Sequence, residues 1–278
     1  MAVADAAKVD ESVAGITFPA IGFGTMRQRG DACAELVDAA LAMGYRNIDT
    51  ARKYGNEAAV GAGIRRSSVS RDDFLVTTKL PPDDLPADRV RAAVEDSLRN
   101  LGLDYVDLFL VHWPRADVPL ADTLGVMADL REAGLTRFIG VSNFPSALLE
   151  EAVGITDLVT NQVEYHPYLA QDVVLPKVRD LGLVLTAYCP LGRGGPLLRD
   201  PVLGEIAATH GRSVAQVALR WLVQQPRVVA VPGTSSVEHL RENLSVYDFT
   251  LDDSEMAAIG RLARGDRVVN PPTAPAWD

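Results

Sequence analysis

The stretch FLVTTKLPPDDLPADRVRAAVEDSLRNLGLDYVDLFLVH, residues 74–112, decides the fold. It contains two short apolar runs, FLVTTK (74–79) and VDLFLVH (106–112), each typical of a buried parallel strand. Between them, residues 86–101 begin with a proline and end before Gly102, which is the asymmetry expected of a helix. The stretch therefore predicts a strand, a helix and a second, parallel strand.

The same alternation recurs along the whole chain. Six further runs have the same character: AIGFG (20–24), YRNID (45–49), RFIGVSN (137–143), LVTNQ (158–162), LVLTAY (183–188) and VVAVPG (228–233). Helical patterns cover residues 31–43, 119–133, 145–153, 172–181, 213–225, 237–246 and 252–264. Eight strand–helix units without a linker favour a closed (β/α)8 barrel, a TIM barrel, as a single domain over residues 1–278. We also expect a hairpin before Ala20 and an irregular, proline-rich tail over 268–278.

Composition and charge exclude several classes of protein. The chain has 27 basic and 37 acidic residues and a net charge of −10, which argues against nucleic acid and anionic membranes as partners. No stretch approaches the roughly 18 apolar residues of a membrane helix, and the N-terminus lacks the apolar segment of a signal peptide. Cys33 and Cys189 are too few for a disulfide framework and suit a reducing compartment. We expect a cytoplasmic monomer.

Polar residues end the apolar runs. The residues at these ends are Asp49, Lys79, His112, Ser142, Asn143, Asn161, Gln162 and Tyr188. In a barrel the C-terminal ends of the strands meet on one face, where active sites are built. Any one of these groups is commonly a structural ion pair or loop anchor. Asp49, Lys79, His112 and the nearby Tyr54 together favour acid–base chemistry, although their spacing alone names no reaction.

Six motifs resemble those of the aldo-keto reductases. They are GYRNIDTARKYGNE (44–57), TTKL (77–80), DLFLVHWP (107–114), GVSNF (140–144), NQVEYHPYL (161–169) and AYCPLG (187–192). GFGTM (22–26) and RENL (241–244) match more loosely, and the motifs follow family order over nearly the whole chain. The chain is similar to the bacterial branch that includes the diketogluconate reductases. The resemblance implies a barrel that binds a nicotinamide cofactor without a Rossmann domain, and the chain has no GxGxxG opening.

The resemblance also implies roles for individual residues. It places a catalytic tetrad on Asp49, Tyr54, Lys79 and His112, in which Tyr54 donates a proton to the substrate carbonyl and Lys79 lowers the pKa of Tyr54. It places the cofactor on Thr25, Asp49, Ser142, Asn143, Gln162, Tyr188, Leu191, Gly192, Thr234, Ser235, His239, Glu242 and Asn243. The substrate would contact Met26, Tyr54, Leu80, Trp113 and Phe144, with Trp277 either as a lid or as part of a frayed terminus.

One segment departs from the family pattern. In VPGTSSVEHLREN (231–243), Gly233 and His239 stand where the resemblance implies a Lys and an Arg that bind the 2′-phosphate of NADP. The hydroxyls of Thr234, Ser235 and Ser236 and the nearby Arg241 are further candidates for that phosphate. We therefore expect NADPH as the preferred cofactor, with NAD as the alternative.

The resemblance to the aldo-keto reductases implies NAD(P)H-dependent reduction of an aldehyde or ketone to an alcohol. The rival hypothesis is a nucleotide-binding regulatory or interaction subunit with little turnover. The complete set of acid–base residues favours the enzyme. Metal-dependent hydrolysis is poorly supported, because the four histidines show no paired ligand spacing and no metal site is predicted. The expected partner is a small carbonyl substrate.

Overall fold

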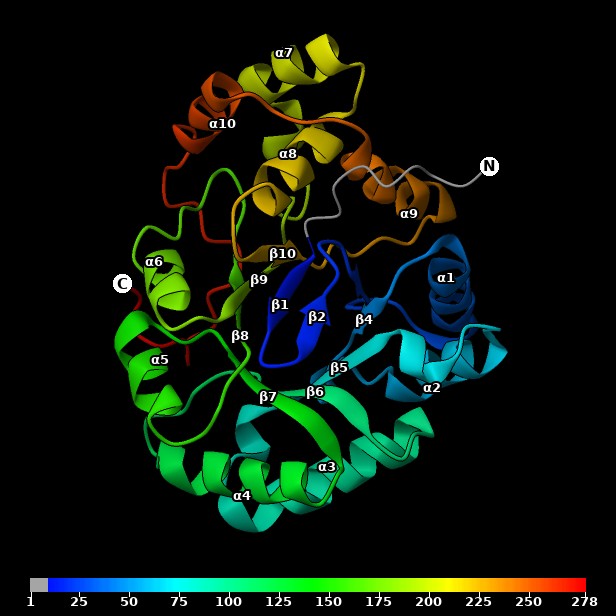
Figure 1. Cartoon of the computed structure of the whole chain (residues 1–278), viewed down its shortest axis with the longest axis vertical. Helices are drawn as coiled ribbons and strands as arrows, with labels where there is room; N and C mark the ends of the chain where they lie inside the picture. Colours follow the sequence, from blue (N-terminus) through cyan, green and yellow to red (C-terminus); the bar gives the residue numbers. More distant parts are fainter. Residues whose placement is uncertain (1–9) are drawn as a thin grey trace.

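The computed structural model describes residues 10–278, and at its centre lies a sheet of eight parallel strands. In chain order they are β3 (Phe23–Gly24), β4 (Asn47–Asp49), β5 (Leu75–Leu80), β6 (Val106–Val111), β7 (Thr136–Ser142), β8 (Thr160–Glu164), β9 (Val184–Tyr188) and β10 (Val228–Ala230). The sheet closes on itself because Gly22 N–H donates to Ala230 O, and Ala230 N–H to Ala20 O, both at 2.8 Å. Helices surround the strands (Figure 1), so the predicted (β/α)8 barrel is confirmed.

Ten α-helices are found in the described residues. They are α1 (Gly30–Met43), α2 (Glu57–Arg66), α3 (Ala87–Leu101), α4 (Leu120–Glu132), α5 (Ser146–Val153), α6 (Val174–Asp180), α7 (Pro201–His210), α8 (Val214–Val223), α9 (Val237–Leu244) and α10 (Asp253–Gly260). Helices α2 and α7 were not predicted from the sequence, and α10 ends at Gly260, before the predicted end at residue 264. Within residues 10–278 no helix combines the length and apolar character that crossing a bilayer requires.

Helix α2 was missed because its glycines interrupt the apolar pattern, and the packing of the helix requires them. A Cβ atom on Gly61 would lie 2.0 Å from Leu101 O, and one on Gly63 would lie 2.5 Å from Ala34 O. The backbone of α2 therefore packs directly against α1 and the end of α3. At these two positions a larger apolar residue, which would have produced the usual helical periodicity, does not fit.

The N-terminal hairpin closes the end of the barrel at which the strands begin. Strands β1 (Glu11–Val13) and β2 (Ile16–Phe18) pair antiparallel and cross the centre of the barrel in Figure 1. Ile16 and Phe18 are buried against apolar side chains inside the barrel: Leu108, Leu110, Val159, Val184 and Val229. The predicted hairpin is thus confirmed, and the tail over 268–278 contains no helix or strand, as expected.

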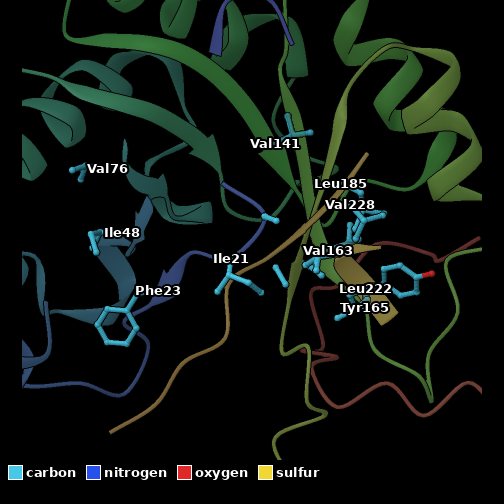
Figure 2. Close-up of a cluster of buried hydrophobic side chains, with 14 of the residues drawn as sticks. Ile21, Phe23, Ile48, Val76, Val141, Val163, Tyr165, Leu185, Leu222 and Val228 are labelled. Carbon is cyan, nitrogen blue, oxygen red and sulfur yellow. The ribbon is translucent and has the colours of Figure 1, made fainter. Parts of the chain in front are cut away.

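A second apolar layer lies between the strands and the helices. Figure 2 shows strand residues of this layer, among them Phe23, Ile48 and Val228, together with Leu222 of α8. Successive residues of a strand point to opposite faces, so one set fills this layer and the other points into the barrel. Packing on both faces holds the C-terminal ends of the strands in place.

We expect Gly61→Ala to lower the free energy of unfolding by about 1–3 kcal/mol, because the added methyl group would overlap Leu101 O. Gly125 of α4 has open space around it, so Gly125→Ala should raise the free energy of unfolding by about 0.5–1 kcal/mol. Urea unfolding followed by circular dichroism measures both changes. Equal stability of the two variants would contradict the close packing of α2.

Candidate active site

The C-terminal ends of the strands and the loops after them enclose a cavity of about 1010 Å³. It is also lined by part of the C-terminal segment, residues 268–271. The predicted site residues that line it are Met26, Asp49, Tyr54, His112, Trp113, Ser142, Asn143, Gln162, Tyr188, Leu191, Thr234 and Ser235. The structure therefore brings together residues from seven strand ends into one space.

A buried ion pair lies beneath this cavity. Lys79 of β5 is fully buried, and its Nζ donates to Asp49 Oδ1 at 2.6 Å and to Thr50 O at 2.7 Å. The other carboxylate oxygen, Asp49 Oδ2, accepts from Gln162 Nε2 at 2.7 Å. Burial lowers the pKa of Lys79, and the charge of Asp49 opposes that lowering. Both carboxylate oxygens of Asp49 therefore accept hydrogen bonds, which offset the free-energy cost of burying its negative charge.

Tyr54 lies directly above the ion pair. It ends the short 3-10 helix η1 (Arg52–Tyr54), and Gly55 continues the chain with a left-handed φ of 65°. Lys79 Nζ lies 5.3 Å from the centre of the Tyr54 ring, and the His112 ring meets the Tyr54 ring edge-on at 5.8 Å. The four predicted acid–base residues are thus neighbours in space.

The protonation of Tyr54 differs from the sequence expectation. Burial, and then the negative charge of Asp49, raise the pKa of Tyr54 well above its usual range. The net shift is therefore opposite in direction to the expected lowering by Lys79, whose own charge is paired with Asp49 at 2.6 Å. The phenol consequently keeps its proton at neutral pH, which is the form that a proton donor needs.

His112 is neutral at physiological pH in this environment. Burial lowers its pKa well below the usual range, and the charges of Lys79 and Lys53 add to the lowering. Its backbone N–H donates to Leu80 O at 3.0 Å, which fixes the residue at the end of β6. Within residues 10–278, His112 Nδ1 is buried without a hydrogen-bond partner. A neutral imidazole has one donor and one acceptor nitrogen, so it can bind a carbonyl oxygen without carrying charge.

Side-chain amides form the wall beside His112. Asn143 has a left-handed φ of 64°, and its Nδ2 donates to His112 O at 2.9 Å. Asn143 Oδ1 accepts from Tyr188 OH at 2.7 Å, so one amide holds both the strand end and the tyrosine ring. Gln162 donates through Nε2 to Asp49, which leaves its Oε1 as an acceptor at the cavity. Ser142 Oγ completes the wall by donating to Gln162 O at 2.8 Å.

A group of cations that the sequence patterns did not indicate surrounds the cavity. Arg27, Arg29, Lys53 and Arg193 all line it. Arg27 and Arg193 have left-handed φ values of 74° and 59°, and the charges of both act on the Cys189 thiol, whose pKa burial raises. The two guanidinium groups therefore lie near Cys189, where they suit a diphosphate. The glycines beside Arg193 marked this loop in the sequence, but nothing there distinguished the arginine from a solvated one.

The far end of the cavity contains the segment that departs from the family pattern. A Cβ on Gly233 would lie 2.9 Å from Gly24 O, so the two loops approach closely there. Thr234 Oγ1 accepts from Ser236 N–H at 3.0 Å and lies 3.3 Å from His239 Nδ1. His239 is exposed behind Thr234 and does not line the cavity, nor do Glu242 and Asn243.

Two predicted substrate contacts lie elsewhere. Leu80 and Phe144 are fully buried in the layer between strands and helices, so neither side chain reaches the cavity. The strand alternation explains Leu80, since Lys79 points into the barrel and its neighbour must point out. Thr25 is also buried and braces the site by donating from Oγ1 to Asp49 O at 3.0 Å. Gly192 lines a smaller adjoining cavity of about 250 Å³.

A buried carboxylate fixes the C-terminal segment along the cavity. Glu164, the last residue of β8, is fully buried. Its Oε1 accepts from His166 Nε2 at 2.9 Å and from Val268 N–H at 2.7 Å, and its Oε2 accepts from Val269 N–H at 2.8 Å. The segment that lines the cavity over 268–271 is therefore hydrogen-bonded to the barrel at its first residues.

The other end of this segment contacts the barrel at Trp113. The rings of Trp277 and Trp113 meet edge-on at 6.0 Å, and the Arg267 guanidinium lies 3.7 Å from the centre of the Trp277 ring. Asp278 accepts from both N–H and Oγ of Ser146 at 2.7 Å, which caps the start of α5. Trp277 thus folds back to the mouth of the cavity.

Comparisons with known proteins agree with this architecture. A model of the Aldo/keto reductase family matches residues 20–264. Morphine 6-dehydrogenase of Pseudomonas putida is 43% identical over 269 residues, covering 91% of this chain and 90% of that protein. Methylglyoxal reductase DkgB of Escherichia coli O157:H7 is 39% identical over 269 residues, covering 95% and 100%. A crystal structure of a proposed 2,5-diketo-D-gluconic acid reductase B has a TM-score of 0.95 at 45% identity, covering 99% of both chains.

The anchoring of the C-terminal segment can be tested with Glu164→Gln. Removing the charge weakens two hydrogen bonds from backbone N–H groups, so we expect hydrogen exchange at Val268 and Val269 to accelerate about tenfold or more. Mass spectrometry of peptides that contain Val268 and Val269 measures these exchange rates in the original protein and in the variant. Glu151→Gln, the same change on an exposed part of α5, is the control and should leave exchange unchanged. Identical exchange in both variants would disprove the anchor.

Proposed function

The chain belongs to the aldo/keto reductase family and is an oxidoreductase, and we propose that it reduces an aldehyde or small ketone to an alcohol with NADPH. The observation that carries this proposal is the contact of Tyr54 with both Lys79 and His112 at one end of the cavity. These groups are an acid that keeps its proton, a buried cation and a neutral hydrogen-bonding ring.

Each of these side chains has a separate task in the proposed reaction. His112 binds the carbonyl oxygen of the substrate and turns it toward the phenol of Tyr54. Tyr54 then gives its proton to that oxygen, and the negative charge that develops on the phenol is stabilised by Lys79 beneath the ring. Asp49 keeps Lys79 in place and protonated. The carbonyl carbon receives a hydride, which is the chemistry that a reduced nicotinamide supplies when bound.

The residues present fit a nicotinamide cofactor. Gln162 Oε1 and the Ser142 hydroxyl offer groups to a carboxamide, and the Tyr188 ring, held by Asn143, offers a flat surface to the nicotinamide. Arg27 and Arg193 with the loop from Leu191 would hold the diphosphate. Thr234 and Ser235, which line the cavity, are the proposed contacts of the 2′-phosphate. His239, Glu242 and Asn243 lie outside the cavity lining, and we propose them only for the outermost, adenine end of the cofactor.

No observation favours the regulatory subunit. Burying the charges of Lys79 and Asp49 costs free energy, even though the two are paired. A partner-binding role would not require such a pair beneath a protonated phenol, whereas acid–base catalysis would. The relatives differ in the substrates that their names state: morphine, methylglyoxal and 2,5-diketo-D-gluconic acid. Family membership therefore leaves the charge of the substrate open.

Tyr54→Phe tests the proposed acid. The variant lacks the proton that the carbonyl oxygen must receive, so we expect kcat/KM for carbonyl reduction to fall by about 10² to 10⁴. Binding of NADPH, followed by protein fluorescence, should stay within about threefold of the original protein, because the ring remains in place. Reduction at the original rate by this variant would remove Tyr54 from the mechanism.

The cofactor preference is tested by comparing kcat/KM for NADPH and NADH with one aldehyde substrate. We expect the value for NADPH to be the higher, because Thr234 and Ser235 offer hydroxyl donors to a 2′-phosphate. Replacing Thr234 by Val should reduce the difference and leave kcat/KM for NADH unchanged. A higher value for NADH in the original protein would contradict the preference while leaving the reductase proposal intact.

A further inference from the structure

The cavity is positively charged in a chain whose net charge is −10. Among the described residues that line it, the cations are Arg27, Arg29, Lys53 and Arg193, and the acid is Asp49. Both oxygens of Asp49 already accept hydrogen bonds, from Lys79 and Gln162. The positive charge around the cavity is thus left without a balancing acid, and such a cavity attracts anions.

These cations lie in different parts of the cavity. Arg27 and Arg193 are near Cys189, on the side proposed for the diphosphate. Lys53 directly precedes Tyr54 in η1, and its charge acts on His112, so it lies on the side where the carbonyl would bind. Of these three cations, Lys53 is therefore the one on the side of Tyr54 and His112.

Lys53 differs from the preceding residue, Arg52, in having no acidic partner. Arg52, one residue earlier, pairs with Asp84 at 2.9 Å and with Asp96 at 3.1 Å on the outside of the barrel. Within residues 10–278 no carboxylate lies within ion-pair distance of Lys53. Its ammonium therefore lines the cavity without a counter-charge, and an anionic group bound beside it would supply one.

We propose that the carbonyl substrate carries a carboxylate and that Lys53 binds it. This inference rests on the proposed reductase function. The reaction would convert an oxo acid to a hydroxy acid: the carbonyl carbon gains a hydride, the oxygen gains the Tyr54 proton, and the carboxylate is unchanged. Lysine suits this task because its flexible stem lets one charge reach carboxylates at different distances from the carbonyl. Trp113 and Met26 line the same cavity and would contact an apolar remainder.

Benzoylformate and its methyl ester are matched probes that differ in one negative charge. We expect the original protein to have a higher kcat/KM for the acid than for the ester. Lys53→Met should lower kcat/KM for the acid by about ten- to a hundredfold and change that for the ester by less than about threefold. Lys53→Arg keeps the charge and should keep the preference for the acid. Equal loss for both probes, or no loss for either, would overturn the proposal.

Two further measurements separate this inference from the proposed function. Lys177→Met, which removes an exposed lysine paired with Glu150, controls for the change in net charge and should leave the preference for the acid unchanged. Binding of benzoate to the protein with NADPH, followed by tryptophan fluorescence, requires no turnover, and Lys53→Met should weaken it about tenfold or more. Lys53-dependent binding without any reduction would contradict the reductase and support the carboxylate site. Reduction of the carbonyl probes together with benzoate binding that does not depend on Lys53 would support the reductase and contradict the carboxylate site.

Discussion

The ion pair between Lys79 and Asp49 is the contact on which the rest of the site depends. Two charges removed from water are stable only when each is matched, and removing either one alone would leave an uncompensated charge in the core. Here the match involves three strands, since Asp49 ends β4, Lys79 lies in β5, and Gln162 approaches from β8, 113 residues further along the chain. The pair itself joins adjacent strands, but the hydrogen bond from Gln162 reaches it across the barrel. The pair places a cation under Tyr54.

The strands of the barrel position the acid–base residues, and the loops after them provide side chains that can select the substrate. Strand ends hold the ion pair, His112 and the amide wall, all of which are buried and hydrogen-bonded to neighbouring backbone. The cations and the aromatic residues at the mouth come from loops and from the C-terminal segment, where side chains can vary without disturbing the core. This division explains how relatives with similar folds act on substrates as different as those that their names state.

Much of this architecture could be read from local patterns. Apolar runs with polar ends located the strands and Asp49, Lys79 and His112, because strand ends in a barrel converge. Tyr54 was found in the loop that follows Asp49. Helix α7 was readable too, since Asp200 caps it, Pro201 begins it and Gly211 follows it. Helix α2 was hidden by glycines that only its packing explains, and the anchor at Glu164 uses backbone N–H groups, which carry no side-chain signature. The pKa of Tyr54 depends on burial and on the sum of neighbouring charges, which residue types alone do not provide.

The cap that Asp278 provides to α5 has a consequence for the order of folding. Ser146 and Asp278 are 132 residues apart, and the cap can form only once α5 is in place. Glu164 likewise can receive the segment only after β8 has joined the sheet. The barrel should therefore assemble first and the C-terminal segment dock last, so that a newly made chain acquires its complete substrate cavity in the final step of maturation.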